Sequence, residues 1–499
     1  MMMKKAIHVI TLLLALLPAL ALHGQAGLRP RGDVNCDWTV NIADVNGIID
    51  AIFNDTPYHS LYTYAYDING DKQINISDLN AVIGAIMGDK LAPMPTYSGT
   101  LPVLYINTDG HRNIVSKDDY LDAFWWIDAM GIDGYESIGS TEAPKMMQIK
   151  GRGNATWTMH DKKPFRLKFS QAQPVLGMPS SQHWVLLSGS DYWIGQINDA
   201  LPHEIGRQMG MSWNPDQRPV EVVLNGQYIG LYHLTEKIRV EKNRVNIIKQ
   251  KDRETDSTKV TGGWLLEIDN YDEPGHIEFT EGNGWPFWAT PHSPEELSNV
   301  QRNYMTDFLI QADSAIYCED KSSTEWEKYI DIDSLAIFYI IQEIMDNCEA
   351  FHGSCYFHKQ RGDSTKLVFG PLWDFGSSFS RYTATYEFDH FIYDEAPSYV
   401  HLRWIAEIAK FPRFQKCVRK HWQRFYSEVY PQLGQFLDEF GDRIKAAGEC
   451  DYKRWPKSES NNIKFRINFV RKNCFDKKVA WLNSQWGPND GDDVSKLNE

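Results

Sequence analysis

Asp33-Val-Asn-Cys-Asp-Trp-Thr-Val-Asn-Ile-Ala-Asp44 recurs further along the chain, in altered form, as Asp67-Ile-Asn-Gly-Asp-Lys-Gln-Ile-Asn-Ile-Ser-Asp78. Each copy is followed by a short stretch with apolar residues at helical spacing, over residues 45–53 and 79–87. A repeated unit of one polar loop and one short helix predicts a small all-α module, to which we assign residues 27–90.

The polar side chains of both loops fall at the spacing that a hard cation requires. Ca²⁺ takes six to eight oxygen ligands, and a loop supplies them from positions 1, 3, 5, 7, 9 and 12. Trp38 and Lys72 occupy position 6, where an EF-hand has Gly, and Asp replaces Glu at position 12. The alternative, two Asx-rich turns that only cap the helices, is less favoured because the acidic spacing occurs twice. The expected ligands are Asp33, Asn35, Asp37, Thr39, Asn41 and Asp44 in the first loop, and Asp67, Asn69, Asp71, Gln73, Asn75 and Asp78 in the second.

This duplicated loop and helix resembles the type I dockerins, and the resemblance covers about residues 31–90. It implies calcium binding and a cohesin-like protein partner that contacts the faces of the helices. Four residues begin the expected helices and are where we look for that contact: Val45, Asn46, Leu79 and Asn80.

The N-terminal residues 1–26 have the pattern of a secretory signal peptide. Lys4 and Lys5 precede an apolar run over residues 7–22, and small residues follow it. We expect cleavage near Ala21 or Ala26 and a secreted mature protein, in the periplasm, at the cell surface or outside the cell. The apolar run is short for a bilayer and does not recur, so no membrane span is expected.

Composition narrows the class of protein further. With 499 residues, 42% of them hydrophobic, the chain is long and apolar enough to bury a sizeable core. A formal net charge of -15 argues against nucleic acid as the main partner, because phosphates select clustered Lys and Arg. Seven thinly spread cysteines favour isolated thiols over a disulfide framework, although a Cys348–Cys355 pair stays open.

The remainder of the chain predicts one large α+β domain over residues 101–486, between a proline-containing linker at 91–100 and an acidic tail at 487–499. Asn225-Gly226 lies between two β-rich runs and predicts a hairpin. Residues 163–169 alternate, which predicts a strand with Phe165, Leu167 and Phe169 on one face. Residues 331–347 have helical spacing, with Asp333 or Ser334 as N-cap, and the chain from residue 401 onward is mainly helical.

Six segments of this domain form a recognisable series when they are read in order. They are Gly151-Arg-Gly-Asn-Ala-Thr-Trp157, Lys162-Lys-Pro-Phe-Arg-Leu-Lys168, His183-Trp-Val-Leu-Leu187, Glu221-Val-Val-Leu-Asn-Gly-Gln-Tyr-Ile-Gly-Leu-Tyr232 with Glu236, Gly262-Gly-Trp-Leu-Leu-Glu267, and Phe369-Gly-Pro-Leu-Trp-Asp-Phe375. This series resembles the CotH family of kinase-like proteins. The resemblance implies an atypical protein-kinase-like fold that uses ATP with Mg²⁺ or Mn²⁺.

Phosphoryl transfer needs a cation on the phosphates, a carboxylate that orients it, and carboxylates or amides on the metal. The resemblance implies Lys163, Lys168 and Glu236 for the nucleotide and Asp374 for the metal. Where the family has Asp and, five residues later, Asn, this chain has Glu349 and Ser354, and Gly376 replaces a second Asp. Glu349 and Asp374 are therefore the expected catalytic pair, and Ser354 a weak ligand. An oxygen displaced by about an ångström costs roughly a hundredfold in rate.

Asp346 offers a substitute carboxylate, and if it lies on the expected helix it points about 60° away from Glu349.

These residues leave three functions open. The leading hypothesis is a secreted CotH-like kinase that phosphorylates Ser or Thr of exported proteins. The second is a degenerate CotH-like scaffold or binding protein, because three expected site residues are changed. The third is a glycan-binding or carbohydrate-active protein, because dockerins accompany such domains and the chain has 17 Trp. Trp125, Trp184 and Trp264 lie among apolar residues, which favours core positions instead.

Overall fold

The computed structural model describes residues 28–189, 196–269, 273, 275–379, 387–394, 404–456 and 462–488. The expected signal peptide and nearly all of the expected acidic tail lie outside these residues. The described residues form two compact units, each of mixed segments. Unit 1 is drawn from Met1–Ser190, Gln217–Thr235 and Arg443–Asn462, and unit 2 from Asp191–Asp216, Glu236–Asp442 and Ile463–Glu499.

The first part of unit 1 contains the two expected helices, α2 (Ile42–Phe53) and α3 (Ile76–Ile86). Each begins three residues before the expected start, because Asn41 and Asn75 act as N-caps in capping boxes with Asp44 and Asp78. The helices share one apolar core made of Val34, Val40, Val45, Ile48, Ile68, Leu79, Val82 and Ile86.

The partner contacts expected at Val45 and Leu79 are wrong, since both side chains are buried in that core.

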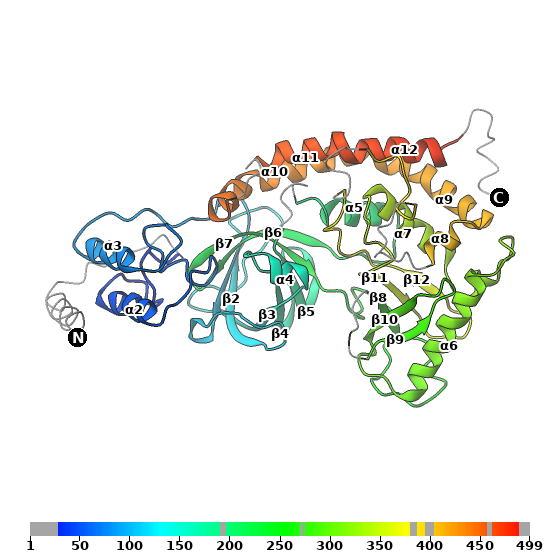
Figure 1. Cartoon of the computed structure of the whole chain (residues 1–499), viewed down its shortest axis with the longest axis horizontal. Coiled ribbons are helices and arrows are strands. Elements are labelled where there is room, and N and C mark those ends of the chain that lie inside the picture. The colour runs from blue at the N-terminus through cyan, green and yellow to red at the C-terminus, as the bar shows by residue number, and fades with distance from the viewer. Residues whose placement is uncertain are drawn as a thin grey trace. The chain divides into compact units, whose positions relative to one another are not determined.

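The rest of unit 1 is built around a closed barrel in the order β1-β2-β3-β4-β5-β7-β6 (Figure 1). Phe165, Leu167 and Phe169 point into it, as the alternating pattern predicts, and Trp125 stacks on Phe169 with ring centroids 4.0 Å apart. Asn225 and Gly226 have φ of 49° and 74° and form the expected hairpin turn. The strands are β1 (Val103–Thr108), β2 (Leu121–Asp128), β3 (Lys145–Gly151), β4 (Phe165–Val175), β5 (Met178–Leu187), β6 (Gln217–Leu224) and β7 (Gln227–Glu236), with helix α4 (Ala155–Met159) between β3 and β4.

Unit 2 contains an antiparallel five-stranded sheet in the order β12-β11-β8-β10-β9, together with most of the helices (Figure 1). Its strands are β8 (Trp264–Ile268), β9 (Ile277–Thr280), β10 (Pro286–Ser293), β11 (Cys355–Lys359) and β12 (Leu367–Phe369). The helices after β7 are α6 (Asn299–Ile316), α7 (Ile332–Ile344), α8 (Ile405–Ile408), α9 (Pro412–Arg424), α10 (Tyr430–Arg454), α11 (Ile463–Val470) and α12 (Asp476–Trp486), and α5 (Ala200–Gln208) precedes β6. The helical C-terminal portion is confirmed.

Helix α7 differs from expectation at both ends. Its N-cap is Asp331, not Asp333 or Ser334, and the Asp331 carboxylate accepts the Ser334 N–H at 2.8 Å. The helix ends at Ile344, and Asp346 has a φ of 46°, so Asp346 lies beyond the helix. The helical angle expected between Asp346 and Glu349 is therefore wrong.

Two general expectations can be compared with the described residues. All seven cysteines are free thiols. Among the described residues, no helix is both long enough and apolar enough to cross a bilayer. The structure is mixed α/β, as expected, while its relation to a protein kinase remains a proposal.

Candidate functional site

The two acidic loops of unit 1 have the same internal hydrogen bonds. Asp33 accepts the Trp38 N–H at 3.0 Å, and Asp67 accepts the Lys72 N–H at 3.1 Å. The last carboxylate of each loop reaches back to the start of the loop, where Asp44 accepts the Val34 N–H at 2.8 Å and Asp78 accepts the Ile68 N–H at 2.7 Å. The carboxylates at positions 1 and 12 are thus brought together in both loops.

Backbone conformation agrees between the loops despite the missing glycines. Position 6 has a positive φ in both, 70° at Trp38 and 63° at Lys72, and so does position 4, 64° at Cys36 and 83° at Gly70. This left-handed conformation costs a residue other than Gly roughly 1–2 kcal/mol. The departure from the EF-hand pattern at position 6 therefore leaves the turn intact.

The charge on these loops fits a bound cation. Asp33, Asp44, Asp67 and Asp78 are each at most 2% exposed. Burial raises the pKa of Asp33 to about 6, even though the Arg29 guanidinium lowers it, and burial also raises the pKa of Asp44 and of Asp67. Buried carboxylate oxygens held together from both ends of a loop are the kind of donor set that Ca²⁺ binds.

The loop and helix module packs on the barrel within unit 1. Arg29 donates its N–H to the Gly226 carbonyl at the tip of the β6–β7 turn, at 2.9 Å, and Leu61 belongs to the apolar core of the barrel. The Arg454 guanidinium lies 4.1 Å from the Tyr64 ring and 4.1 Å from the Trp455 ring. These contacts join a segment of the module to both the barrel and the end of α10.

A cavity of about 510 Å³ lies beside this contact. Helix α2 lines it with Gly47, Asp50 and Ala51, and its C-cap Asn54 also lines it. The barrel lines it with residues that include Leu224 and Asn225, and none of the lining residues comes from α3. Ile76 and Met87, at the two ends of α3, are 59% and 63% exposed. Helix α2 thus lines the cavity beside the barrel, with only its last residue, Phe53, strongly exposed among its large apolar side chains (57%), while α3 has apolar side chains in solvent at both ends.

In unit 2, buried polar side chains contact the main chain of the segment that carries Asp374. The Leu372 N–H donates to Asn214 Oδ1 at 2.9 Å, and the Leu372 carbonyl lies 3.2 Å from Nε2 of the buried His203. Asp374 itself has a φ of 59° and is exposed to solvent. This arrangement fixes the main chain and leaves the carboxylate free to reach a ligand.

Glu349 lies close enough to Asp374 for their charges to interact. Partial desolvation and the Asp374 carboxylate raise the pKa of Glu349, against a hydrogen bond from Ser377, although the Glu349 side chain keeps access to solvent. Ser354 is partly buried with a φ of 52°. Two neighbouring carboxylates that both reach solvent are suited to hold a divalent cation.

Asp346 belongs to a different cluster, which is buried. Lys478 Nζ lies 3.1 Å from Asp346 Oδ1 and 3.4 Å from Glu343 Oε2, and His390 Nε2 lies 2.8 Å from Asp346 Oδ1. Burial raises the pKa of Glu343 to about 7. Burial alone would also raise the pKa of Asp346, but the His390 hydrogen bond and the Lys478 charge hold the pKa of Asp346 below its usual value. Asp346 is thus a structural carboxylate.

The expected nucleotide-binding and catalytic residues belong to both units. Lys163 and Lys168 belong to unit 1, and Glu236, Glu349, Ser354 and Asp374 belong to unit 2. Lys163 donates to the Trp157 carbonyl at 2.5 Å, burial lowers its pKa, and Lys168 is exposed on β4.

Glu236 is buried and has its own partners in unit 2. It lies 3.8 Å from Arg244 Nε and accepts the Asp216 N–H at 3.0 Å.

One buried ion pair was missed from the sequence. Lys162 is 3% exposed, and its Nζ lies 2.7 Å from Asp451 Oδ1 and 2.5 Å from the Leu231 carbonyl. Asp451 also accepts the Leu231 N–H at 2.8 Å, which closes the cluster. Lys162 is next to Lys163, which was an expected site residue, so the sequence pointed to this segment. However, no neighbouring residue indicates that the partner of Lys162 lies 289 positions away.

Comparison with protein families agrees with the organisation described above. A family model described as CotH kinase protein matches residues 149–482, and one described as Dockerin type I domain matches residues 31–87. No curated protein matches the chain. Both acidic loops fall within the second match, and the Glu349–Asp374 pair falls within the first.

Proposed function

Because the chain belongs to the CotH kinase protein family and carries a type I dockerin domain, we propose that it is a secreted phosphotransferase of exported proteins, held to a cohesin-type partner. In this proposal it transfers a phosphoryl group from ATP to Ser or Thr hydroxyls, with Mg²⁺ or Mn²⁺. The observation that carries the proposal is the proximity of Glu349 and Asp374 in solvent.

The two carboxylates take different roles in this proposal. Asp374, fixed through its main chain and exposed, binds the metal ion, which neutralises phosphate charge when bound. Glu349 accepts the proton of the acceptor hydroxyl. Its raised pKa makes it a stronger base than an ordinary Glu at neutral pH. Ser354 and Ser377 are proposed to support the metal site.

The test is transfer of radiolabel from ATP to a Ser-rich acceptor protein, with Mn²⁺, by the mature chain. Asp374→Ala and Glu349→Gln should each abolish transfer, while Asp320→Ala, at an exposed carboxylate elsewhere in unit 2, should leave it unchanged. Absence of transfer by the unsubstituted chain, across several acceptors and both metals, would reject the kinase proposal.

A binding protein on the same scaffold is the second candidate. Gly376 and Ser354 favour it, because each replaces a residue that the family uses for metal or catalysis. Calorimetric titration separates the two candidates. ATP that binds with Mn²⁺ but is not turned over supports a nucleotide-dependent scaffold, and no ATP binding leaves a scaffold alone.

A carbohydrate function loses the support of three tryptophans, whereas Trp38 and Trp285 are 40% and 49% exposed. Trp125, Trp184 and Trp264 are fully buried, so none of them can act as a stacking platform for a sugar. Glycan binding would have to use other side chains.

The dockerin domain is proposed to bind Ca²⁺ in both loops and its cohesin-type partner through α3. Helix α3 offers Ile76, Asn80 and Met87 to solvent, whereas α2 lines the cavity beside the barrel. Ile76→Asp with Met87→Asp should therefore weaken capture by a cohesin, and Asn54→Asp on the barrel side should not. Equal effects would place the partner elsewhere.

A further inference from the structure

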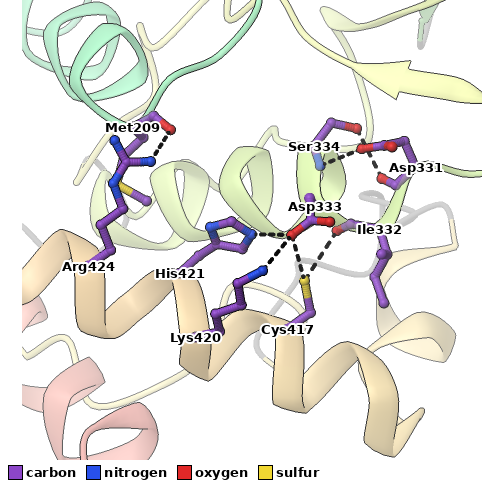
Figure 2. A network of polar contacts seen from close by, with 9 residues as sticks. All are labelled: Met209, Asp331, Ile332, Asp333, Ser334, Cys417, Lys420, His421 and Arg424. Atoms are coloured by element: carbon purple, nitrogen blue, oxygen red, sulfur yellow. Dashed lines mark hydrogen bonds and ion pairs between the residues drawn. The ribbon is translucent and has the colours of Figure 1, made fainter. Parts of the chain in front are cut away.

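A cluster of three metal-ligating side chains lies at the contact between α7 and α9, away from Glu349 and Asp374 in the sequence and assigned no role above. Asp333 stands in the first turn of α7, and Cys417 and His421 lie four residues apart on α9 (Figure 2). Residues at this spacing share one face of a helix. Their donor atoms all lie within 4.8 Å of one another.

The distances are close to those of a coordination shell. Asp333 Oδ1 lies 3.7 Å from Cys417 Sγ and 2.6 Å from His421 Nε2. Bond lengths of about 2.0–2.3 Å at tetrahedral angles separate donor atoms by roughly 3.3–3.6 Å. The sulfur–oxygen distance is therefore slightly longer than this range, and the sulfur and nitrogen lie within 4.8 Å of each other. The nitrogen and oxygen need to separate by about 0.7 Å when an ion replaces their hydrogen bond.

The chemistry of the donors selects the class of metal. Carboxylate oxygen, imidazole nitrogen and thiolate sulfur together suit a borderline-soft ion such as Zn²⁺, whereas Ca²⁺ and Mg²⁺ take oxygen. We propose that Asp333, Cys417 and His421 bind one Zn²⁺ ion, with water as the fourth ligand. Asp333 has a side chain that is 54% exposed, which gives the ion and the water a path from solvent.

One cation at the site has to move. Lys420 Nζ lies 3.5 Å from Asp333 Oδ1, and its side chain is 48% exposed (Figure 2). A half-exposed ion pair of this kind contributes little, so the ammonium can return to water at small cost. The thiol must also lose its proton, which bound Zn²⁺ promotes because it stabilises the thiolate.

The competing explanation is a polar contact that only joins the two helices. In that case the Asp333–His421 hydrogen bond would hold α9 against α7 without any metal. The two explanations differ in what Cys417 does, because a hydrogen-bonding role needs no thiolate.

The test uses the full mature chain with its dockerin loops saturated by Ca²⁺ and Co²⁺ as the probe. We expect one equivalent of Co²⁺ to give the visible bands of a tetrahedral site and a thiolate-to-cobalt charge-transfer band, and one equivalent of Zn²⁺ to abolish both. Cys417→Ser should remove the charge-transfer band. Asp333→Asn and His421→Asn should each weaken Zn²⁺ binding by at least the roughly 10- to 100-fold that loss of an outer-shell partner costs.

Two control variants keep the result specific. Cys318→Ser alters another partly exposed thiol of unit 2, and Cys36→Ser alters the thiol inside the first calcium loop; both should keep the band. A band that survives in Cys417→Ser, or that is lost in Cys36→Ser, would overturn the proposal, as would the absence of stoichiometric binding in a chain whose circular dichroism is unchanged.

Discussion

The side-chain amide of Asn347 donates a hydrogen bond to the main-chain carbonyl of Asp374 at 3.2 Å. It also donates to Gln342 Oε1 at 2.9 Å, so this buried amide joins the end of α7 to the segment that carries the proposed metal ligand. The position of Asp374 therefore depends on a residue that is not expected to contact any ligand.

Asn347→Ala should lower the free energy of unfolding by about 1–3 kcal/mol, because it leaves buried polar partners unsatisfied. Urea denaturation measures this loss. Asn473→Ala, at an exposed amide on the C-terminal helical segment, is the control and should change little. Equal unfolding energies for the two variants would show that the Asn347 amide does not hold Asp374 in place.

Lys478→Met should cost about 3–5 kcal/mol at neutral pH, because it leaves Glu343 and Asp346 as buried carboxylates with less compensation. The loss should shrink as the pH falls, since protonation then neutralises the two acids. Lys472→Met, at an exposed lysine, should stay close to wild type. A penalty independent of pH would contradict this account of the cluster.

Burial lowers the pKa of His203 from 6.5 to about 3, so its stabilising contribution depends on pH. The contribution is complete above pH 6.5 and is lost as the pH falls from there towards 3, because only the unfolded chain accepts the proton readily. The loss is about 1.4 kcal/mol per pH unit. We expect the free energy of unfolding of His203→Gln, measured with urea at pH values from 6 to 4, to fall less steeply with pH than that of wild type, by that amount. An unchanged dependence on pH would contradict the prediction.

Removal of calcium should destabilise the dockerin domain. Ca²⁺ at a hundredfold above its dissociation constant contributes about 2.7 kcal/mol per site, which thermal melting with and without chelator measures. Asp78→Ala should reduce the calorimetric stoichiometry from two ions to one, while Asp55→Ala, an exposed residue after α2, should keep both. Unchanged stoichiometry in Asp78→Ala would remove the second loop from the proposal.

Leu61→Ala should weaken the attachment of the dockerin domain to the barrel, at a cost of about 2–5 kcal/mol, because Leu61 is 3% exposed within the barrel core. Limited proteolysis should then cut between the domain and the barrel more rapidly. Calcium affinity should not change, since Leu61 lies outside both loops. Leu91→Ala, at a partly exposed residue, serves as the comparison.

Local sequence patterns predict local structure well in this chain. The alternation at Phe165, Leu167 and Phe169 and the Asn225-Gly226 turn each depend on a few neighbouring residues, and both were predicted. Errors arise where neighbours compete. The N-cap of α7 is Asp331 and not Asp333. The side chain of Val45 is buried in the core, although Val45 lies near the start of a helix.

Long-range pairs could not be predicted. The Lys162–Asp451 ion pair and the Asp333–His421 hydrogen bond join segments that only the folded chain brings together. The same limit applies to Glu349, since its raised pKa depends on burial and on the Asp374 carboxylate, and both arise only through the folding of unit 2. The family resemblance suggested the chemistry of Glu349 and Asp374, but sequence spacing did not give their distance.

The attachment of the dockerin domain to the barrel has a mechanical consequence. When a flexible linker joins a binding domain to a second domain, the second domain samples a wide volume. The length of the linker then sets the local concentration at which the second domain meets its substrates. Here Leu61, Arg454 and the Arg29–Gly226 hydrogen bond anchor the domain directly. A cohesin that captures α3 would therefore fix the direction in which the barrel faces, and the range of substrates within reach would be set by geometry more than by diffusion.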